Sequence, residues 1–411
     1  MLSRFLIENY RSCLRTSIDL DPNLSVLIGP NGSGKTNILK AIMYLNKMAQ
    51  EENYPPFHTQ VSTAGPRIKA TFEQANGAVR LSALVGAYTD EFNNDVLRGS
   101  VQNWQIGDKK RKRTLRGVPL AFARRVSQQR FRVHYFQRSY IMHPSGPNAV
   151  PRATQEHDWR VLAEVAKYCL GITYYGASQF TNPGSCPVSF EIEEENQRQA
   201  VLRLRGHAKF LHSMYSASKA EANASYAQFI DIVGPRGLRL IDSLKFREFQ
   251  VSSVDRSVRV GGKMEVRTRH KRLVIPQFRI GKQKLSPNQL SEGTFKTLAL
   301  LFHVVTGDST ALLIEEPEVC VHHGLLSSIL EVIKSASRRK QIILSTHSDY
   351  VLDQVKPENV YVVSSDRAVG TQVYKISKTM TSREFGGLRE YLATEGNLGE
   401  YWREGGLEDR S

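Results

Sequence analysis

The sequence has no long hydrophobic run and few cysteines. No stretch reaches about 18 uninterrupted apolar residues, the length that predicts a transmembrane helix. The opening segment MLSRFLIENYRSCLR interrupts its apolar residues with charges, so no secretory signal peptide is expected. The four cysteines form no CxxC pair, which is typical of a reducing compartment without a disulfide framework. We therefore expect a cytoplasmic protein that does not enter a membrane.

Acidic side chains are also in deficit. There are 40 Asp and Glu residues against 56 Lys and Arg, which gives a net charge of +16. Such a field attracts polyanions, with nucleic acid as the first candidate and an acidic protein that mimics DNA as the second. Two runs concentrate the charge, KKRKRTLR at 109–116 and RTRHKRL at 267–273. The alternative is a solvated basic surface that binds no partner.

The hydrophobic pattern changes character twice along the chain. Residues 1–28 predict two strands joined by a turn, and a helix follows from Thr36. Short strands then continue to about residue 150, helical patterns and a β-hairpin fill 195–280, and alternating helices and strands begin at Leu285. We expect an α/β fold in which two lobes bracket a central α+β insertion. The predicted segments are 1–190, 191–284 and 285–411.

The segment GPNGSGKT, residues 29–36, fits the P-loop pattern with a predicted strand before it and a helix after it. Glycines let the backbone curl so that its N–H groups face phosphate oxygens, and the helix N-terminus adds positive charge. Lys35 should reach the β- and γ-phosphates of ATP, and Thr36 should ligate Mg²⁺. The residues predicted to bind nucleotide are Gly29, Asn31, Gly32, Ser33, Gly34, Lys35, Thr36 and Asn37.

Two further apolar strands end in polar groups. The segment ALLIEEPE places Glu315 and Glu316 at the end of one strand. We expect Glu315 to support Mg²⁺ through water and Glu316 to act as the general base or to position the attacking water. The segment LSTHS ends the next strand with His347, which would contact the γ-phosphate and sense its presence. The predicted catalytic residues are Glu316, His347 and Lys35.

The order of these motifs resembles a known superfamily. P-loop, LSEGT, acidic strand and STHS occur in the order of the ABC-type ATPases, in particular the SMC/RecF/OLD-like ATPases called AAA15 or AAA21. The resemblance implies a P-loop ABC-type ATPase head that is assembled from the N- and C-terminal segments. It covers the two ends of the chain, and no motif in the middle contributes to it.

The resemblance also implies an assembly of at least two copies. In this family the signature turn caps the γ-phosphate of ATP that is bound to a second subunit. Ser291, Glu292 and Gly293 match that turn, so a homodimer or higher homo-oligomer would enclose two ATP molecules. Gln179, which follows the strand ITYYG, is the candidate for the family's loop glutamine at Mg²⁺.

The biological role is left to three hypotheses. The compact build, the lack of a nuclease pattern and the segment NLGEYWREGGLE resemble the stand-alone ATPases of PARIS-, AbiL- and Septu-type anti-phage systems. That resemblance implies a sensor that controls a separately encoded, Toprim-like nuclease. The second hypothesis is a RecF-like DNA-binding ATPase of DNA repair. The third is a scaffold whose ATP site is only structural.

Overall fold

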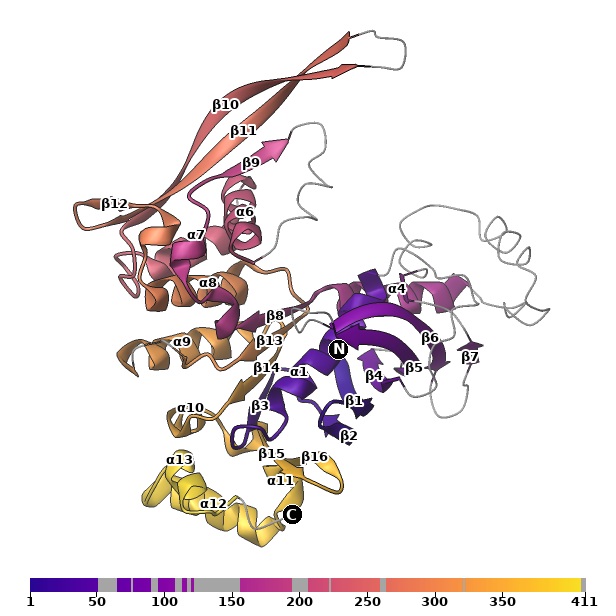
Figure 1. Cartoon of the computed structure of the whole chain (residues 1–411). Helices are drawn as coiled ribbons and strands as arrows, with labels where there is room; N and C mark the ends of the chain where they lie inside the picture. The colour runs from indigo at the N-terminus through magenta and orange to yellow at the C-terminus, as the bar shows by residue number, and fades with distance from the viewer. Residues whose placement is uncertain are drawn as a thin grey trace, which may run out of the picture. The chain divides into compact units, whose positions relative to one another are not determined.

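The structure of the 411-residue chain is a computed structural model. It describes residues 1–50, 65–74, 77–89, 95–107, 113–116, 120–121, 156–193, 206–221, 223–258, 264–319, 321 and 323–407. None of the helices in these ranges is long and apolar enough to cross a bilayer. The chain divides into two compact units (Figure 1). Unit 1 comprises Met1–Tyr174, Asp308–Glu316 and Ser337–Ser411, and unit 2 comprises Tyr175–Gly307 and Pro317–Ala336.

A mostly parallel sheet combines strands from the N-terminal and C-terminal parts of the chain. Its strand order is β16-β15-β3-β14-β13-β8. The strands β15, β3, β14 and β13 run parallel to one another, and β16 is antiparallel to β15. The three central strands are buried along almost their whole length, as expected for a parallel sheet that is covered on both faces. The strands are β3 (Leu24–Ile28), β8 (Ile172–Gly176), β13 (Ala311–Glu315), β14 (Gln341–Thr346), β15 (Val360–Asp366) and β16 (Gly370–Lys375).

The second sheet of unit 1 is antiparallel, with the order β2-β1-β4-β5-β6-β7. The sequence predicted two strands before the P-loop, and this was wrong, because the structure has three there. The missed strand is β2, whose buried positions Cys13, Thr16 and Ile18 include a threonine and therefore give a weak apolar alternation. The strands are β1 (Leu2–Tyr10), β2 (Cys13–Asp19), β4 (Arg67–Gln74), β5 (Gly77–Thr89), β6 (Asp95–Gly107) and β7 (Arg113–Arg116).

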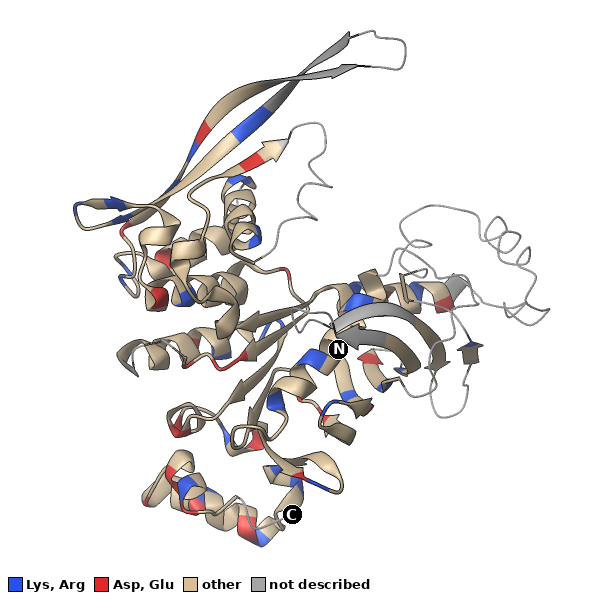
Figure 2. Cartoon of the chain, viewed as in Figure 1, with Lys and Arg blue, Asp and Glu red and all other residues tan. Residues whose placement is uncertain are grey.

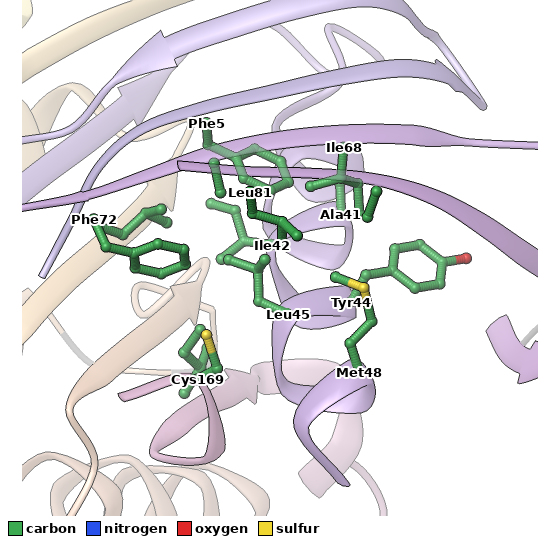
Figure 3. Packing of buried hydrophobic residues seen from close by; sticks show 14 of the residues in the cluster. Phe5, Ala41, Ile42, Tyr44, Leu45, Met48, Ile68, Phe72, Leu81 and Cys169 are labelled. Atoms are coloured by element: carbon green, nitrogen blue, oxygen red, sulfur yellow. The ribbon is translucent and has the colours of Figure 1, made fainter. Parts of the chain in front are cut away.

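Helix α1 (Lys35–Gln50) is held in the core of unit 1. Phe5, Ile68 and Phe72 of the antiparallel sheet pack with Ile42 and Leu45 of the helix (Figure 3). The same hydrophobic cluster contains residues of the parallel sheet and of α4 (Glu156–Leu170). Burying each of these large apolar side chains contributes about 1.5–3 kcal/mol. The N-terminus of α1, which follows the P-loop, is therefore fixed by packing on several sides.

The C-terminal segment of unit 1 forms a small helical layer with its own apolar cluster. Its closing helix is seated on α10, because the Gly399 N–H donates to Asp353 Oδ1 at 2.7 Å and Arg403 Nε lies 3.2 Å from Asp349 Oδ2. The helices are α10 (Asp349–Asp353), α11 (Ile376–Thr379), α12 (Ser382–Thr394) and α13 (Leu398–Arg403).

In its described residues, unit 2 combines four α-helices with a four-stranded antiparallel sheet. The sheet order is β10-β11-β12, and β9 also pairs with β11. The predicted hairpin is present as β10 (Ser243–Val258) and β11 (Met264–Ile280), with β9 (Phe190–Glu193) and β12 (Gln283–Leu285) beside it. The helices are α6 (Gly206–Lys219), α7 (Ala224–Val233), α8 (Glu292–Thr306) and α9 (His323–Ala336).

The fold is α/β with a central α+β portion, as the sequence predicted. The two units interleave along the chain and do not coincide with the segments 1–190, 191–284 and 285–411. Helices α8 and α9 pack together in unit 2, whereas β13 and β14 lie in unit 1. A functional division into two lobes and an insertion stays a prediction.

Candidate active site

The P-loop connects β3 to α1 through residues 29–34. Glycine is required in this loop for two reasons, backbone conformation and lack of space for a side chain. Gly32 and Gly34 have φ of +82° and +105°, in the region that side chains other than glycine rarely adopt. Space is a second constraint, because a Cβ on Gly29 would lie 2.1 Å from Val363 O, and one on Gly34 would lie 2.1 Å from Thr371 Oγ1. The loop thus lies tightly against β15 and β16 of the same unit.

Lys35 is buried at the base of the loop, and its ammonium group contacts the first residues of the loop. Its Nζ donates to Gly29 O at 2.7 Å and to Pro30 O at 2.9 Å. Asn31 and Gly32 are exposed at the tip. The Ser33 hydroxyl is buried and makes no hydrogen bond within the described part of the chain. These features place a cation and backbone N–H groups at the N-terminus of α1, an arrangement that favours an anion.

Thr36 and Glu315 meet directly beside the loop. The Thr36 hydroxyl donates to Glu315 Oε1, and the Tyr174 hydroxyl donates to Glu315 Oε2. Burial and the nearby Glu315 carboxylate raise the pKa of Tyr174, so this phenol stays protonated and remains a donor. A hydroxyl and a carboxylate oxygen in contact are the ligand types that Mg²⁺ prefers, so the pair fits that ion. Sequence reasoning missed Tyr174, whose only signal was its place near the end of an apolar strand.

Glu316 and His347 lie side by side at the ends of neighbouring strands. Register pairs Glu315 of β13 with Ser345 of β14, and the Glu316 N–H donates to Ser345 O at 2.9 Å. His347 Nδ1 is 3.4 Å from Glu316 Oε1. Glu316 has φ of +47°, a left-handed conformation that costs about 1–2 kcal/mol outside glycine. Strain of this kind, at a carboxylate beside a P-loop, is typical of a functional position.

Three further polar residues form a support under the loop. The Asn37 amide donates to Ser12 Oγ at 2.7 Å, and the Thr371 hydroxyl donates to the same atom at 2.8 Å. Thr371 Oγ1 also lies 3.2 Å from Ser33 O. Ser12 lies in the turn between β1 and β2, and Thr371 is in β16. No sequence motif indicated either residue, since their importance comes from the fold.

The signature turn and Gln179 belong to unit 2. Ser291 is the N-cap of α8, where its hydroxyl accepts from Thr294 N at 3.2 Å. Glu292 and Gly293 form the first turn of the helix, and Glu292 Oε1 is 2.7 Å from the buried Nζ of Lys296. Gln179 is exposed on the short 3-10 helix that follows β8. Their predicted roles at a nucleotide remain proposals.

Comparisons with known proteins agree with these motifs. A family profile described as "AAA domain, putative AbiEii toxin, Type IV TA system" matches residues 66–353, which is more than half of the chain. The chain belongs to this AAA family. A second profile, "AAA ATPase domain", matches residues 1–95. The resemblance to ABC-type ATPases of the SMC and RecF kind is thereby confirmed, together with the P-loop ATPase head.

Individual relatives of this AAA-family chain match only in part. The DNA replication and repair protein RecF of Acidothermus cellulolyticus is 33% identical over 88 residues, which is 18% of this chain and 24% of that protein. RecF of Haemophilus influenzae is 50% identical over 44 residues, 11% of this chain and 12% of that protein. The matched part thus spans at most about a quarter of these relatives' own length.

The solved structures that match this chain share less sequence identity with it than these relatives do. The SMC head domain from Thermotoga maritima has a TM-score of 0.39 and 13% identity, and covers 91% of this chain and 98% of its own. An SMC head bound to the C-winged helix domain of ScpA has a TM-score of 0.42 and 14% identity, with 92% and 99% covered. Likeness at this level carries no argument about partners.

Proposed function

We propose that this AAA-family protein binds ATP and hydrolyses it to ADP and phosphate in a Mg²⁺-dependent reaction. The observation that carries the proposal is the contact between Thr36 and Glu315, with Glu316 and His347 at the ends of the adjoining strands. A P-loop, a metal-binding pair and a carboxylate base are the parts that phosphoryl transfer to water needs.

Each side chain has a distinct role in this proposal. The N–H groups of the loop and the Lys35 ammonium bind the β- and γ-phosphates, and Ser33 and Asn37 complete the phosphate contacts. Thr36 and Glu315 would hold Mg²⁺, which when bound neutralises phosphate charge. Glu316 accepts a proton from the attacking water. His347 Nδ1, next to Glu316 Oε1, holds that carboxylate in place and would reach the γ-phosphate.

The signature turn would complete the site of a second copy. Ser291 offers a hydroxyl at the N-terminus of α8, a 15-residue helix whose N-terminus favours an anion. In the proposed assembly Ser291, Glu292 and Gly293 of one chain cap the γ-phosphate of ATP bound to another, and Gln179 approaches Mg²⁺. ATP binding would close the assembly and hydrolysis would open it, so the protein is a homodimeric or larger switch.

As for biological role, we propose a cytoplasmic sensor of a bacterial anti-phage system that controls a separately encoded, Toprim-like nuclease. The family's description as a putative toxin supports a role in such conflict systems. A RecF-like role in DNA repair is the second candidate, which the identity to RecF proteins over 44–88 residues favours. A nuclease gene beside this one supports defence. A repair defect on deletion, with no effect on phage infection, supports the second candidate.

The test of the ATPase is Glu316→Gln, which keeps the shape of the side chain and removes the base. Phosphate release should fall about 100- to 10,000-fold, while ATP still binds. Mass in solution with ATP should rise more for this variant than for the wild type, because the closed assembly is trapped. The matched control is Glu331→Gln, at an exposed position of α9. Wild-type phosphate release by Glu316→Gln would rule out the assigned base.

A further inference from the structure

The described sheet of unit 2 has two chemically different faces. Phe246, Val274 and Phe278 share one face by register, and Phe246 packs on Tyr215 of α6 with ring centroids 5.5 Å apart. Val274 and Phe278 are fully buried. The alternate positions of β10, β11 and β12 point the other way. This second face, here called the outer face, includes Lys245, Arg247, Phe249, Arg279 and Lys284 by the same register.

Four cations gather at one end of the outer face. Lys245, Arg247, Arg279 and Lys284 are all exposed, and none makes an ion pair with the described part of the chain. Figure 2 shows Lys and Arg concentrated at the turn between β11 and β12. Arg279 is directly opposite Lys284. Like charges at directly opposed positions destabilise a sheet, so the arrangement costs the fold stability and points to an anionic partner.

An aromatic ring adjoins these cations. Phe249 follows Arg247 by two residues on the same face, and its side chain is 48% exposed. Val251, the next residue on that face, is 45% exposed. The only ion pair described on the outer face is farther along, where Lys271 Nζ lies 2.9 Å from Glu191 Oε2. The surface therefore changes from basic to aromatic and apolar over a few residues of one strand.

The two basic runs noted in the sequence contribute little to this surface. Residues 109–112 of the first run lie outside the described residues, and so do the side chains of 267–270 in the second. In the described remainder, Lys271 is paired with Glu191 and Arg272 with Glu248. The unpaired cations come instead from positions scattered through 245–284, which only the strand register brings together.

We propose that the outer face of β10, β11 and β12 is a docking surface for single-stranded nucleic acid. Lys245, Arg247, Arg279 and Lys284 contact the phosphates, and Phe249 stacks on a base. A cationic surface with an exposed aromatic ring is the combination that binds single strands without sequence preference. Duplex DNA keeps its base faces stacked and offers Phe249 no partner, and an acidic protein has no bases to stack. The inference goes beyond ATP hydrolysis and does not rest on it.

The experiment measures fluorescence anisotropy of a labelled deoxythymidine oligonucleotide with the full chain. Changing all four cations to alanine should weaken binding about tenfold or more, and lower the salt slope by about 2.8, at about 0.7 for each cation. Phe249→Ala should weaken single-strand binding about fivefold or more and leave duplex binding unchanged. The matched control removes four exposed cations of unit 1: Arg338, Arg339, Arg367 and Arg383.

Several outcomes would overturn the proposal. They are no binding by the wild type, an equal loss in the control variant, or equal binding of duplex and single strand with no effect of Phe249→Ala. Binding of polyglutamate with the same charge dependence, without binding of the oligonucleotide, would make the partner an acidic protein instead. The fourfold variant should melt at or above the wild-type temperature, because a like-charge pair is removed. Basal phosphate release, measured on the same samples, reports separately on the ATPase.

Discussion

His347 Nδ1 lies 3.4 Å from Glu316 Oε1, at the ends of the two parallel strands β14 and β13. Both side chains are partly exposed, at 43% and 33%. In the proposed mechanism these two side chains act as a unit on one water molecule and one phosphate. Groups that act together give mutational effects that do not add.

The first prediction follows from this pair. His347→Ala should lower phosphate release about 100-fold, since Glu316 loses its neighbour, while ATP binding changes little. Combining it with Glu316→Gln should give activity no lower than the slower single variant. Single-turnover hydrolysis and nucleotide binding measure the two effects. If the losses in the double variant multiply, the residues act independently and the pairing has no catalytic meaning.

Tyr174 gives the second prediction, because its hydroxyl donates to the carboxylate oxygen that Thr36 does not contact. Tyr174→Phe removes only that donor. The Mg²⁺ concentration for half-maximal binding of ATP should rise about 3- to 10-fold, equivalent to about 1 kcal/mol for one hydrogen bond. Tyr226→Phe, in unit 2, is the control. An unchanged Mg²⁺ requirement in Tyr174→Phe would mean that Glu315 is positioned by other groups.

Two glycines of the P-loop, Gly32 and Gly34, give the third prediction. Gly34→Ala places a methyl group 2.1 Å from Thr371 Oγ1, whereas a Cβ on Gly32 meets nothing within 4 Å. Gly32→Ala should therefore cost about 1–2 kcal/mol of backbone strain alone. Gly34→Ala should cost more and abolish ATP binding, and adding Thr371→Ala should restore part of it. Thermal unfolding and nucleotide binding test this, and equal effects of the two single variants would contradict it.

The fourth prediction concerns pH and Lys340. Burial lowers the pKa of Lys340 from 10.5 to about 8. Between pH 8 and 10.5 the unfolded chain therefore binds more protons at this residue, so the contribution of Lys340 to the free energy of unfolding rises with pH. Buried Tyr168, Cys169 and Tyr361, whose pKa values burial raises, contribute in the opposite direction, so the effect of Lys340 is the difference between the wild type and a variant that lacks it. This contribution should be about 1–2 kcal/mol once solvent screening is allowed for.

Lys340→Met should remove that contribution and stabilise the protein at pH 7 relative to the wild type, by an amount that shrinks toward pH 10. Denaturant titrations at pH 7 and pH 10 measure the effect against Lys356→Met, at an exposed position. The same pH dependence in Lys340→Met and the wild type would mean that Lys340 makes no such contribution.

The sequence predicted those parts of the protein whose chemistry is local. The P-loop glycines are dictated by backbone shape, and an apolar strand that ends in Glu315 and Glu316 carries its own signal. The family and the α/β class followed from these motifs in order, and both are confirmed. The long β10–β11 hairpin was also visible, because its alternation breaks only at a glycine turn.

What could not be predicted depends on contacts between distant segments. Tyr174 and Thr371 are ordinary strand residues until the fold places them beside Glu315 and Gly34. Strand β2 escaped notice because a buried threonine interrupts its apolar pattern. The cations of the outer face are likewise spread over some forty residues, and only the pairing of three strands makes them neighbours.

The hydrogen bond between the Ser12 and Thr371 hydroxyl groups determines which fragments of the chain can bind ATP. The two residues are 359 positions apart, and both lie against the P-loop through Asn37, Gly34 and Ser33. An N-terminal fragment would hold every P-loop residue and still lack one side of its support. We expect such a fragment to bind ATP poorly, and co-expression with the missing C-terminal piece to restore binding. The P-loop can therefore bind nucleotide well only when the N-terminal and C-terminal segments of the polypeptide are both folded against it.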